Sequence, residues 1–259
     1  MSPREICAAI QTAQREGAKL MRLAHDILAE SKTDHRDLVT QYDRAVQELL
    51  MERLSRALPG ARFFCEENDR HDDLGAEHLF IIDPIDGTMN FVHHLNQSCI
   101  SVAYTHFGRP EAAAVYNPYV DEMFSALRGE GACLNGRPIR VDPAPLSETV
   151  ICFGTAPYDE SKMSRSFVLA ERACRTGLDV RRQGSAALDL CSVAAGRAGA
   201  YFELQVSLWD YAAGALIVSE AGGRVTDIHG SPLPFDGSKP TILAASPANA
   251  AAFLKLSKD

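Results

Sequence analysis

The feature that most constrains this chain is the segment DPIDGT at residues 83–88, which directly follows the apolar run 79–82. The apolar run predicts a short buried strand, and the proline after it has no N–H with which to continue a strand ladder. The glycine and threonine can open a helix whose free backbone N–H groups attract an anion. The two aspartates supply the oxygen ligands that Mg²⁺ prefers. The segment therefore predicts a site for a metal ion and a phosphate group.

Length and charge limit the class of protein that this chain can be. Its 259 residues are 46% apolar and 23% charged, which is enough to bury a complete core as one large domain or two closely packed halves. There are 26 basic and 34 acidic side chains, which give a formal net charge of −8. A surface of that sign disfavours nucleic acid or an anionic membrane as the main partner.

The apolar stretches and the cysteines indicate where the protein works. The first residues carry no basic patch followed by a long apolar core, and no later stretch approaches ~18 uninterrupted apolar residues. We therefore expect a cytoplasmic protein with no membrane partner. The seven cysteines are widely spaced without a Cys-x-x-Cys pair, so we expect reduced, mostly buried thiols rather than disulfides or a zinc site.

The first half of the sequence predicts two helices followed by a sheet. Apolar residues recur at helical spacing over residues 4–30, and a second amphipathic helix is expected from Thr40 to about Leu58, where Pro59-Gly60 ends it. Five segments rich in β-branched and aromatic residues follow between turn signals, which predicts a meandering, mostly antiparallel sheet. The expected strands are 62–65, 79–82, 98–107, 112–116 and 123–127.

Beyond Pro143 the pattern changes to alternating strands and helices, which is typical of an α/β arrangement. We therefore predict an α/β protein with an N-terminal α+β half at residues 1–145 and a C-terminal α/β half at 146–259, packed as one compact unit. The expected elements, strand and helix in turn, are 149–153, 161–175, 178–182, 185–195, 200–204 and 209–221.

Acidic residues recur at places that suit metal binding. Besides the two aspartates of the 83–88 segment, these are Asp43, the pair Glu66-Glu67 and Asp210. Glu66 and Asp83 both lie where predicted strands end, so neighbouring strands can bring their carboxylates together to bind a cation. Most acidic side chains are solvated surface groups, so the residues alone leave open whether any one of these binds metal.

Five motifs resemble those of the inositol monophosphatase family. The two signature stretches are DPIDGTMNF at 83–91 and WDYAAG at 209–214, the latter running on to EAGG at 220–223. The other three motifs fall in the order and near the spacing that the family uses, and the likeness spans nearly the whole chain. They are DLVT at 37–40 with Asp43, the pair Glu66-Glu67, and GSAALDL at 184–190.

The resemblance implies a layered αβαβα fold, a homodimer, inhibition by lithium, and hydrolysis of phosphate monoesters on small polyols. It also implies dependence on Mg²⁺, with two to three ions in each active site. The first ion would be held by Glu66, Asp83 and the carbonyl of Ile85, and the second by Asp83, Asp86 and Asp210.

The same resemblance implies catalytic roles close to these ligands. A third, weaker ion would lie near Glu66 and reach Asp43 through water. Glu66, Thr88 and Asp43 are candidates to orient the attacking water or to take its proton. Metal activation is needed because a phosphate monoester dianion repels hydroxide and has a poor leaving group. Backbone N–H groups of Gly87 and Thr88 would hold the phosphoryl oxygens.

Substrate contacts and supporting residues follow by family analogy. Glu203, the outer oxygen of Asp86 and the backbone around Ala186 would contact substrate hydroxyls, with Asp210 also facing the substrate.

Four further residues are expected near the site. Trp209, the single tryptophan, is expected to pack in the core and fix the aspartate after it. Lys32 either matches a family lysine near the active-site mouth or is an ordinary exposed lysine. Glu67 and Ser185 belong to the motifs and are expected to support their neighbours rather than to bind the ligand.

Several alternatives remain open at this stage. Myo-inositol 1-phosphate is the default substrate, but relatives handle fructose 1,6-bisphosphate, NADP, nucleotide 3′-phosphates and histidinol phosphate. A haloacid-dehalogenase-type phosphatase is disfavoured because Ile85 stands where its second aspartate would be. A regulatory binding protein that keeps the fold is the remaining alternative.

Overall fold

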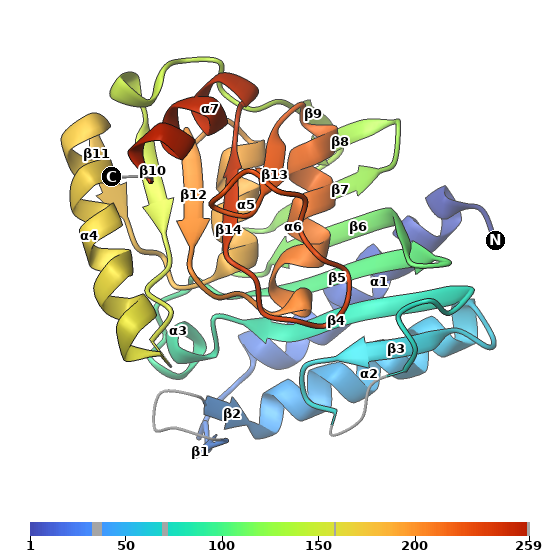
Figure 1. The fold of residues 1–259 in the computed structure, drawn as a ribbon. Coiled ribbons are helices and arrows are strands. Elements are labelled where there is room, and N and C mark those ends of the chain that lie inside the picture. Colours follow the sequence, from blue (N-terminus) through green and yellow to red (C-terminus); the bar gives the residue numbers. More distant parts are fainter. Residues whose placement is uncertain (33–37, 69–71, 158, 258–259) are drawn as a thin grey trace.

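The computed structural model describes residues 1–32, 38–68, 72–157 and 159–257. These residues fold into five stacked layers, in the order helices, sheet, helices, sheet, helices (Figure 1). Three groups of buried side chains fill the spaces between the layers. The predicted α/β fold with αβαβα layering is confirmed.

The first layer consists of helices α1 (Pro3–Arg22) and α2 (Gln41–Ala57). Each begins at a capping box, closed by Glu5 in α1 and by Asp43 in α2, so their first N–H groups are satisfied. Their apolar faces pack together and against the outer face of the larger sheet. The helix predicted to begin at Thr40 is confirmed.

The first helix is shorter than its apolar spacing predicted. It ends at Arg22, so the expectation of a helix over residues 4–30 is wrong. Asp26 adopts a left-handed backbone with φ of 49°, and strand β1 (Ala29–Ser31) follows and pairs with β2 (Leu38–Thr40). The apolar spacing therefore continues past the end of the helix, into residues that do not form a helix.

The larger sheet has seven strands in the order β3-β4-β5-β6-β7-β8-β9. Only β3 and β4 pair in parallel, which confirms the predicted meandering, mostly antiparallel sheet. Strands β8 and β9 are additional to the prediction. The bounds are β3 (Arg62–Cys65), β4 (His78–Asp86), β5 (Cys99–His106), β6 (Arg109–Asn117), β7 (Glu122–Leu127), β8 (Gly131–Leu134) and β9 (Arg137–Ile139).

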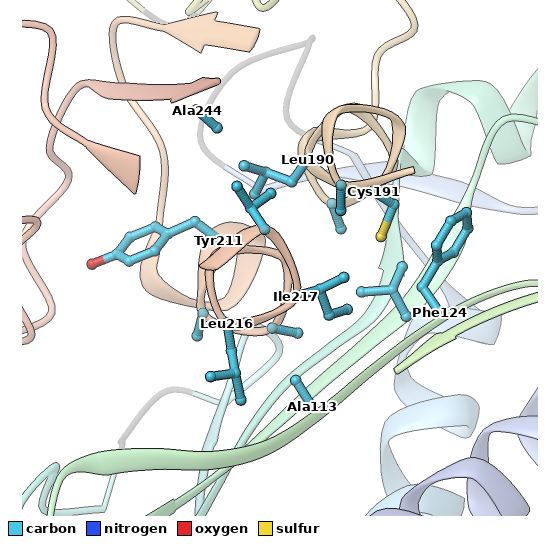
Figure 2. Close-up of a cluster of buried hydrophobic side chains, with 14 of the residues drawn as sticks. Ala113, Phe124, Leu190, Cys191, Tyr211, Leu216, Ile217 and Ala244 are labelled. Atoms are coloured by element: carbon cyan, nitrogen blue, oxygen red, sulfur yellow. The ribbon is translucent and has the colours of Figure 1, made fainter. Parts of the chain in front are cut away.

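Helices α5 (Ala186–Ala194) and α6 (Leu208–Glu220) form the middle layer, between the two sheets. Figure 2 shows Leu216 and Ile217 of α6 directed toward the larger sheet, near Ala113 and Phe124. At the far end of α6, the Glu220 carboxylate accepts hydrogen bonds from the backbone N–H groups of Gly129 (2.9 Å) and Gly131 (3.0 Å) in the β7–β8 turn.

The smaller sheet has five strands in the order β11-β10-β12-β14-β13, and helices α4 and α7 cover its outer face (Figure 1). The predicted alternation is confirmed as far as α6, while β13, β14 and α7 are additional. The bounds are η1 (Leu146–Glu148), β10 (Val150–Phe153), α4 (Glu160–Thr176), β11 (Asp179–Arg181), β12 (Ala200–Glu203), β13 (Arg224–Thr226), β14 (Ile242–Ala245) and α7 (Pro247–Leu256).

Two further observations bear on the class of protein. All seven cysteines are free thiols and most of them are buried. Of the helices that the structure describes, none combines the length and apolarity that a bilayer span requires.

Candidate metal and phosphate site

A cavity of about 360 Å³ lies where the ends of strands β4, β10 and β12 meet the first turns of α5 and α6. Segments far apart in the sequence meet there because both sheets point strand ends toward the same edge (Figure 1). Most residues predicted for the site line this cavity. They are Glu66, Asp83, Ile85, Asp86, Gly87, Thr88, Ser185, Ala186, Glu203 and Asp210.

A β-bulge brings both aspartates of the 83–88 segment to the cavity. Asp83 pairs with Ser101 and Asp86 pairs with Cys99, so β4 contains one residue more than β5 between these pairs. In a regular strand, residues three apart point to opposite faces of the sheet. The bulge cancels that alternation, and Pro84 suits it because proline lacks the N–H that a ladder needs. Both carboxylates therefore line one cavity.

Glu66 reaches the cavity from the neighbouring strand. Its backbone N–H donates to the Ile82 carbonyl at 3.1 Å, which continues the parallel pairing of β3 with β4 by one residue. This register sets Glu66 beside Asp83, as expected for carboxylates at the ends of adjacent strands.

Helix starts hold the remaining two acids in place. Asp210 accepts the Ser207 N–H at 2.6 Å in the first turn of α6, and Asp86 accepts the Ala187 N–H at 2.7 Å in the first turn of α5. Ser185 also donates its hydroxyl to Asp86 and caps α5 through the Leu188 N–H at 3.2 Å. One oxygen of each carboxylate is thus fixed by the protein.

The acids of this cavity repel one another. Burial, followed by repulsion from Glu66, Asp86 and Asp210, holds the pKa of Asp83 well above its usual range. Burial and then Asp86 and Glu66 do the same to the pKa of Asp210. Burial raises the pKa of Asp86 to about 6, against the opposing hydrogen bonds from Ser185 and Ala187. An arrangement of this kind costs stability unless a cation or protons compensate it.

The donor set fits a hard divalent cation. Mg²⁺ binds carboxylate and carbonyl oxygens. Six carboxylates line the cavity, and four of them, together with the backbone of Ile85, are the predicted ligands: Glu66, Asp83, Asp86 and Asp210. In the part of the chain that the structure describes, no three His, Cys, Asp or Glu side chains are already gathered in a geometry that would hold an ion. Hydrogen bonds to protein donors and to Lys32 account for the present orientations of these acids.

Lys32 forms ion pairs with both glutamates of the Glu66-Glu67 pair. Its Nζ donates to Glu66 Oε1 at 2.9 Å and to Glu67 Oε1 at 2.6 Å, and only 23% of its side chain is exposed. Burial alone would lower the pKa of Lys32, but the two glutamates outweigh burial and raise it. Lys32 is therefore ion-paired to a residue of the cavity, Glu66, although its backbone lies at the surface.

Asp43 lies behind the cavity wall and contacts it through Thr88. The Thr88 hydroxyl donates to the Ile85 carbonyl at 3.0 Å and lies 3.3 Å from Asp43 Oδ1. Burial raises the pKa of Asp43 to about 6, although Thr40 donates hydrogen bonds that oppose the rise. The N-cap of α3 (Thr88–Val92) is Gly87, so Thr88 does not act as a helix cap. Asp37 lies outside the described residues.

Glu203, the last residue of β12, also lines the cavity. Its carboxylate accepts a hydrogen bond from the Tyr201 hydroxyl at 2.7 Å and from the Ala156 N–H at 3.3 Å. These donors are uncharged, unlike the lysine that faces Glu66.

Trp209, in the first turn of α6, is partly buried against the core between the two sheets, where its ring packs against Phe64 of β3 with centroids 5.8 Å apart. The cavity is also lined by three polar residues that the sequence patterns did not single out as ligand contacts. They are Arg182, Asp189 and Gln205. Asp189 belongs to the GSAALDL motif, and its buried carboxylate accepts the Gln183 side-chain N–H at 2.7 Å.

A model of the inositol monophosphatase family matches residues 3–259 of this chain. The protein belongs to the inositol monophosphatase family. The match covers both sheets and every residue of the cavity, so the family resemblance seen in the motifs extends to the entire fold.

Curated inositol monophosphatase relatives carry two kinds of name. The chain is 41% identical to the putative Nus factor SuhB of Neisseria meningitidis serogroup A over 254 residues, which covers 96% of this chain and 95% of the relative. It is 37% identical to the inositol-1-monophosphatase of Mesorhizobium japonicum over 224 residues, covering 85% and 84%.

Solved structures of family members share the fold. The extragenic suppressor protein suhB of Bartonella henselae superposes with a TM-score of 0.91 at 32% identity, covering 98% of each chain. An IMPase/NADP phosphatase complexed with Mg²⁺ and phosphate superposes with a TM-score of 0.84 at 26% identity, covering 97% of this chain and 92% of that one.

Proposed function

We propose that this protein hydrolyses a small phosphate monoester, with myo-inositol 1-phosphate as substrate and Mg²⁺ as cofactor. The observation that carries the proposal is the convergence of four carboxylates on the cavity that also contains Gly87 and Thr88. Family membership supports the same reaction class, and a relative of this fold is known as a complex with Mg²⁺ and phosphate.

Glu66, Asp83, Asp86, Asp210 and the Ile85 carbonyl would hold two to three Mg²⁺ ions. Bound magnesium supplies an activated water at neutral pH and neutralises the ester oxygen as it leaves. Rotation of Glu66 away from Lys32 would free its carboxylate for this role, because Lys32 holds Oε1 in the described arrangement.

Thr88 and Asp43 are suited to handle the proton of the attacking water. The Thr88 hydroxyl lines the cavity and lies 3.3 Å from Asp43 Oδ1, which connects a cavity oxygen to a buried carboxylate. Burial raises the pKa of Asp43 to about 6, which suits a general base near neutral pH. The Thr88 hydroxyl would orient the water, and Asp43 would accept the proton through it.

The turn at Gly87 would receive the phosphoryl group. Gly87 has a left-handed backbone with φ of 85°, and a Cβ there would lie 2.9 Å from the Gln97 carbonyl. Only glycine fits that position, so the backbone of Gly87 and Thr88 remains open to the cavity as an anion site requires. Glu203, Asp86 and Ala186 would contact the hydroxyls of the departing polyol.

A phosphate-release screen tests this proposal. The panel contains myo-inositol 1-phosphate, fructose 1,6-bisphosphate, NADP, a nucleotide 3′-phosphate and histidinol phosphate, each with Mg²⁺, with Mg²⁺ plus Li⁺, and with EDTA. We expect myo-inositol 1-phosphate to give the highest kcat/KM, inhibition by Li⁺, and no activity in EDTA. Equal activity in EDTA would contradict the metal mechanism, and a higher kcat/KM for another substrate would replace the proposed one.

A Nus-factor role is a second candidate, because several relatives of this chain are named for it. This role would conflict with the expectation that nucleic acid is not a partner, because the transcription machinery contains nucleic acid. A binding role would not need the carboxylates. The Asp83→Asn variant should therefore lose hydrolysis yet keep any transcription-elongation activity measured in the corresponding deletion strain, and loss of both would tie the second role to catalysis.

The family resemblance also supports a homodimer in the cytoplasm. Sedimentation of the purified chain with and without Mg²⁺ measures the first property, and fractionation of the source cells measures the second.

A further inference from the structure

On the β12 side of the cavity, Gly154 lies so close to the Glu203 carboxylate that no side chain fits at position 154. A Cβ added to Gly154 would lie 1.9 Å from Glu203 Oε2 and 2.4 Å from Oε1. Real Cβ atoms do not approach other atoms so closely, so Glu203 could keep its position only if residue 154 has no side chain. Both residues line the cavity.

Neither backbone can move aside to relieve such a contact. The Gly154 N–H donates to the Phe202 carbonyl at 2.9 Å, which extends the parallel pairing of β10 with β12 past Phe153. Glu203 is the next residue on β12, and its own backbone pairs with Ile242 of β14. A side chain at position 154 would therefore act on the Glu203 carboxylate and leave the sheet in place.

Two neutral donors hold the carboxylate over the glycine. The Tyr201 hydroxyl donates to Glu203 Oε2 at 2.7 Å, and the Ala156 N–H donates to Oε1 at 3.3 Å. Tyr201 is fully buried, so its hydroxyl has a fixed direction and no competing water. Ala156 presents its N–H from a left-handed backbone with φ of 44°, a conformation that non-glycine residues adopt at an energetic cost.

We propose that Gly154 and Tyr201 are positioning residues that set the Glu203 carboxylate as a hydroxyl acceptor, so that this wall selects leaving groups with a free hydroxyl. The inference rests on the proposed phosphatase function and adds the two residues that fix the direction of the Glu203 carboxylate. A carboxylate already bound to two neutral donors keeps acceptor capacity for a third, and a substrate hydroxyl satisfies it.

The test compares two substrates that differ in the leaving group. Myo-inositol 1-phosphate offers hydroxyls to Glu203, whereas 4-nitrophenyl phosphate offers none. In Gly154→Ala we expect the ratio of their kcat/KM values to fall about tenfold or more, because a charge-assisted hydrogen bond is lost for only one of them. In Tyr201→Phe, which removes one donor and keeps the ring, we expect a fall of about threefold.

Two matched variants separate positioning from damage to the fold. A Cβ at Gly199 would lie 2.0 Å from the Thr149 hydroxyl oxygen, outside the cavity, so Gly199→Ala introduces a comparable contact and should change both substrates equally. In a Glu203→Ala background the carboxylate is gone. There, Gly154→Ala should change the substrate ratio by less than about twofold, since coupled residues lose their coupling when one is removed.

Several outcomes would overturn the inference. One is an equal loss for both substrates in Gly154→Ala, and another is an undiminished loss in the Glu203→Ala background. A crystal structure of Gly154→Ala that keeps Glu203 in contact with Tyr201 would overturn the positioning role even if no activity were measurable. Absence of Mg²⁺-dependent hydrolysis of both substrates by the unchanged protein would instead overturn the proposed function.

Discussion

The two walls of the cavity both present carboxylates, but they hold them in opposite ways. On the β4 side, burial and then repulsion from Glu66, Asp86 and Asp210 raise the pKa of Asp83. On the β12 side, Glu203 accepts hydrogen bonds from the uncharged donors Tyr201 and Ala156. Crowded anions suit a multivalent cation, whereas a carboxylate whose hydrogen-bond donors are uncharged suits a hydroxyl. The surroundings of each acid therefore indicate its ligand better than the acid itself does.

We call the side of the cavity with Glu66, Asp83, Asp86 and Asp210 the crowded wall. Removing one charge from it gives the strongest test of the difference between the two sides. Asp83→Asn keeps the side-chain volume but removes a shared ligand, so we expect at least ~10³-fold lower kcat in a phosphate-release assay with Mg²⁺. The control is Asp179→Asn, a half-buried aspartate of β11 that pairs with Arg181 and does not line the cavity, and it should leave kcat unchanged. Activity of Asp83→Asn near that of the unchanged protein would refute the metal assignment.

In the absence of metal, the free energy of unfolding should depend on pH through the buried Asp86 of the crowded wall. Burial raises the pKa of Asp86 in the folded protein to about 6, above the usual 3.8. Below about pH 4 the group is protonated in both states and contributes nothing. As the pH rises toward 6 the unfolded chain releases its proton first, which destabilises the folded protein by up to ~3 kcal/mol.

Urea unfolding in EDTA from pH 4 to 7 measures this loss, and saturating Mg²⁺ should reverse it. The stability of Asp86→Asn, relative to the unchanged protein, should rise over the same interval. Parallel pH curves for the two proteins would show that Asp86 carries no such penalty.

A smaller effect is expected at the hydroxyl that connects the cavity to Asp43. Thr88→Val keeps the branched shape but removes the hydroxyl, and we expect kcat to fall about 10- to 100-fold because proton transfer from water loses its path. Thr88→Ser keeps the hydroxyl and should retain most activity. Equal losses in both variants would point to packing rather than to proton transfer.

The smallest expected effect is at Lys32, the cation already paired with the crowded wall. Lys32→Met removes a positive charge that competes for Glu66, so the Mg²⁺ concentration for half-maximal activity should fall about threefold. Lys32→Arg should leave it near the original value. An increase in the required Mg²⁺ for Lys32→Met would mean that Lys32 organises the ligands instead of competing for them.

Much of the fold could be predicted because the elements depend on capping residues and apolar runs within their own segments. The helix beginning at Thr40 follows from its capping box, and the buried strand before Asp83 follows from its apolar run. Helix α7 could also have been predicted from the sequence, since Ser246 caps it and Pro247 is its first residue. The first helix was overextended because apolar spacing continued past Arg22, while the left-handed residue Asp26 left no signal in composition.

The site was harder to predict from the sequence wherever it depends on tertiary geometry. Residues at strand ends, such as Glu66 and Asp83, could be grouped because neighbouring ends meet. The bulge that turns Asp86 to the same cavity depends on pairing with β5, and Gly154 gains significance only from its distance to Glu203. Arg182 and Gln205 lie just beyond strand ends and carry no motif of their own. Such features require the sheets to be placed before they can be recognised.

Helix α6 links the interior to the site because it lies between both sheets. Its first turn supplies Asp210 to the cavity, and its last residue, Glu220, is held by the β7–β8 turn on the far side. Packing along the whole helix therefore contributes to where Asp210 lies, and divalent-ion binding is expected to depend on contacts far from the cavity.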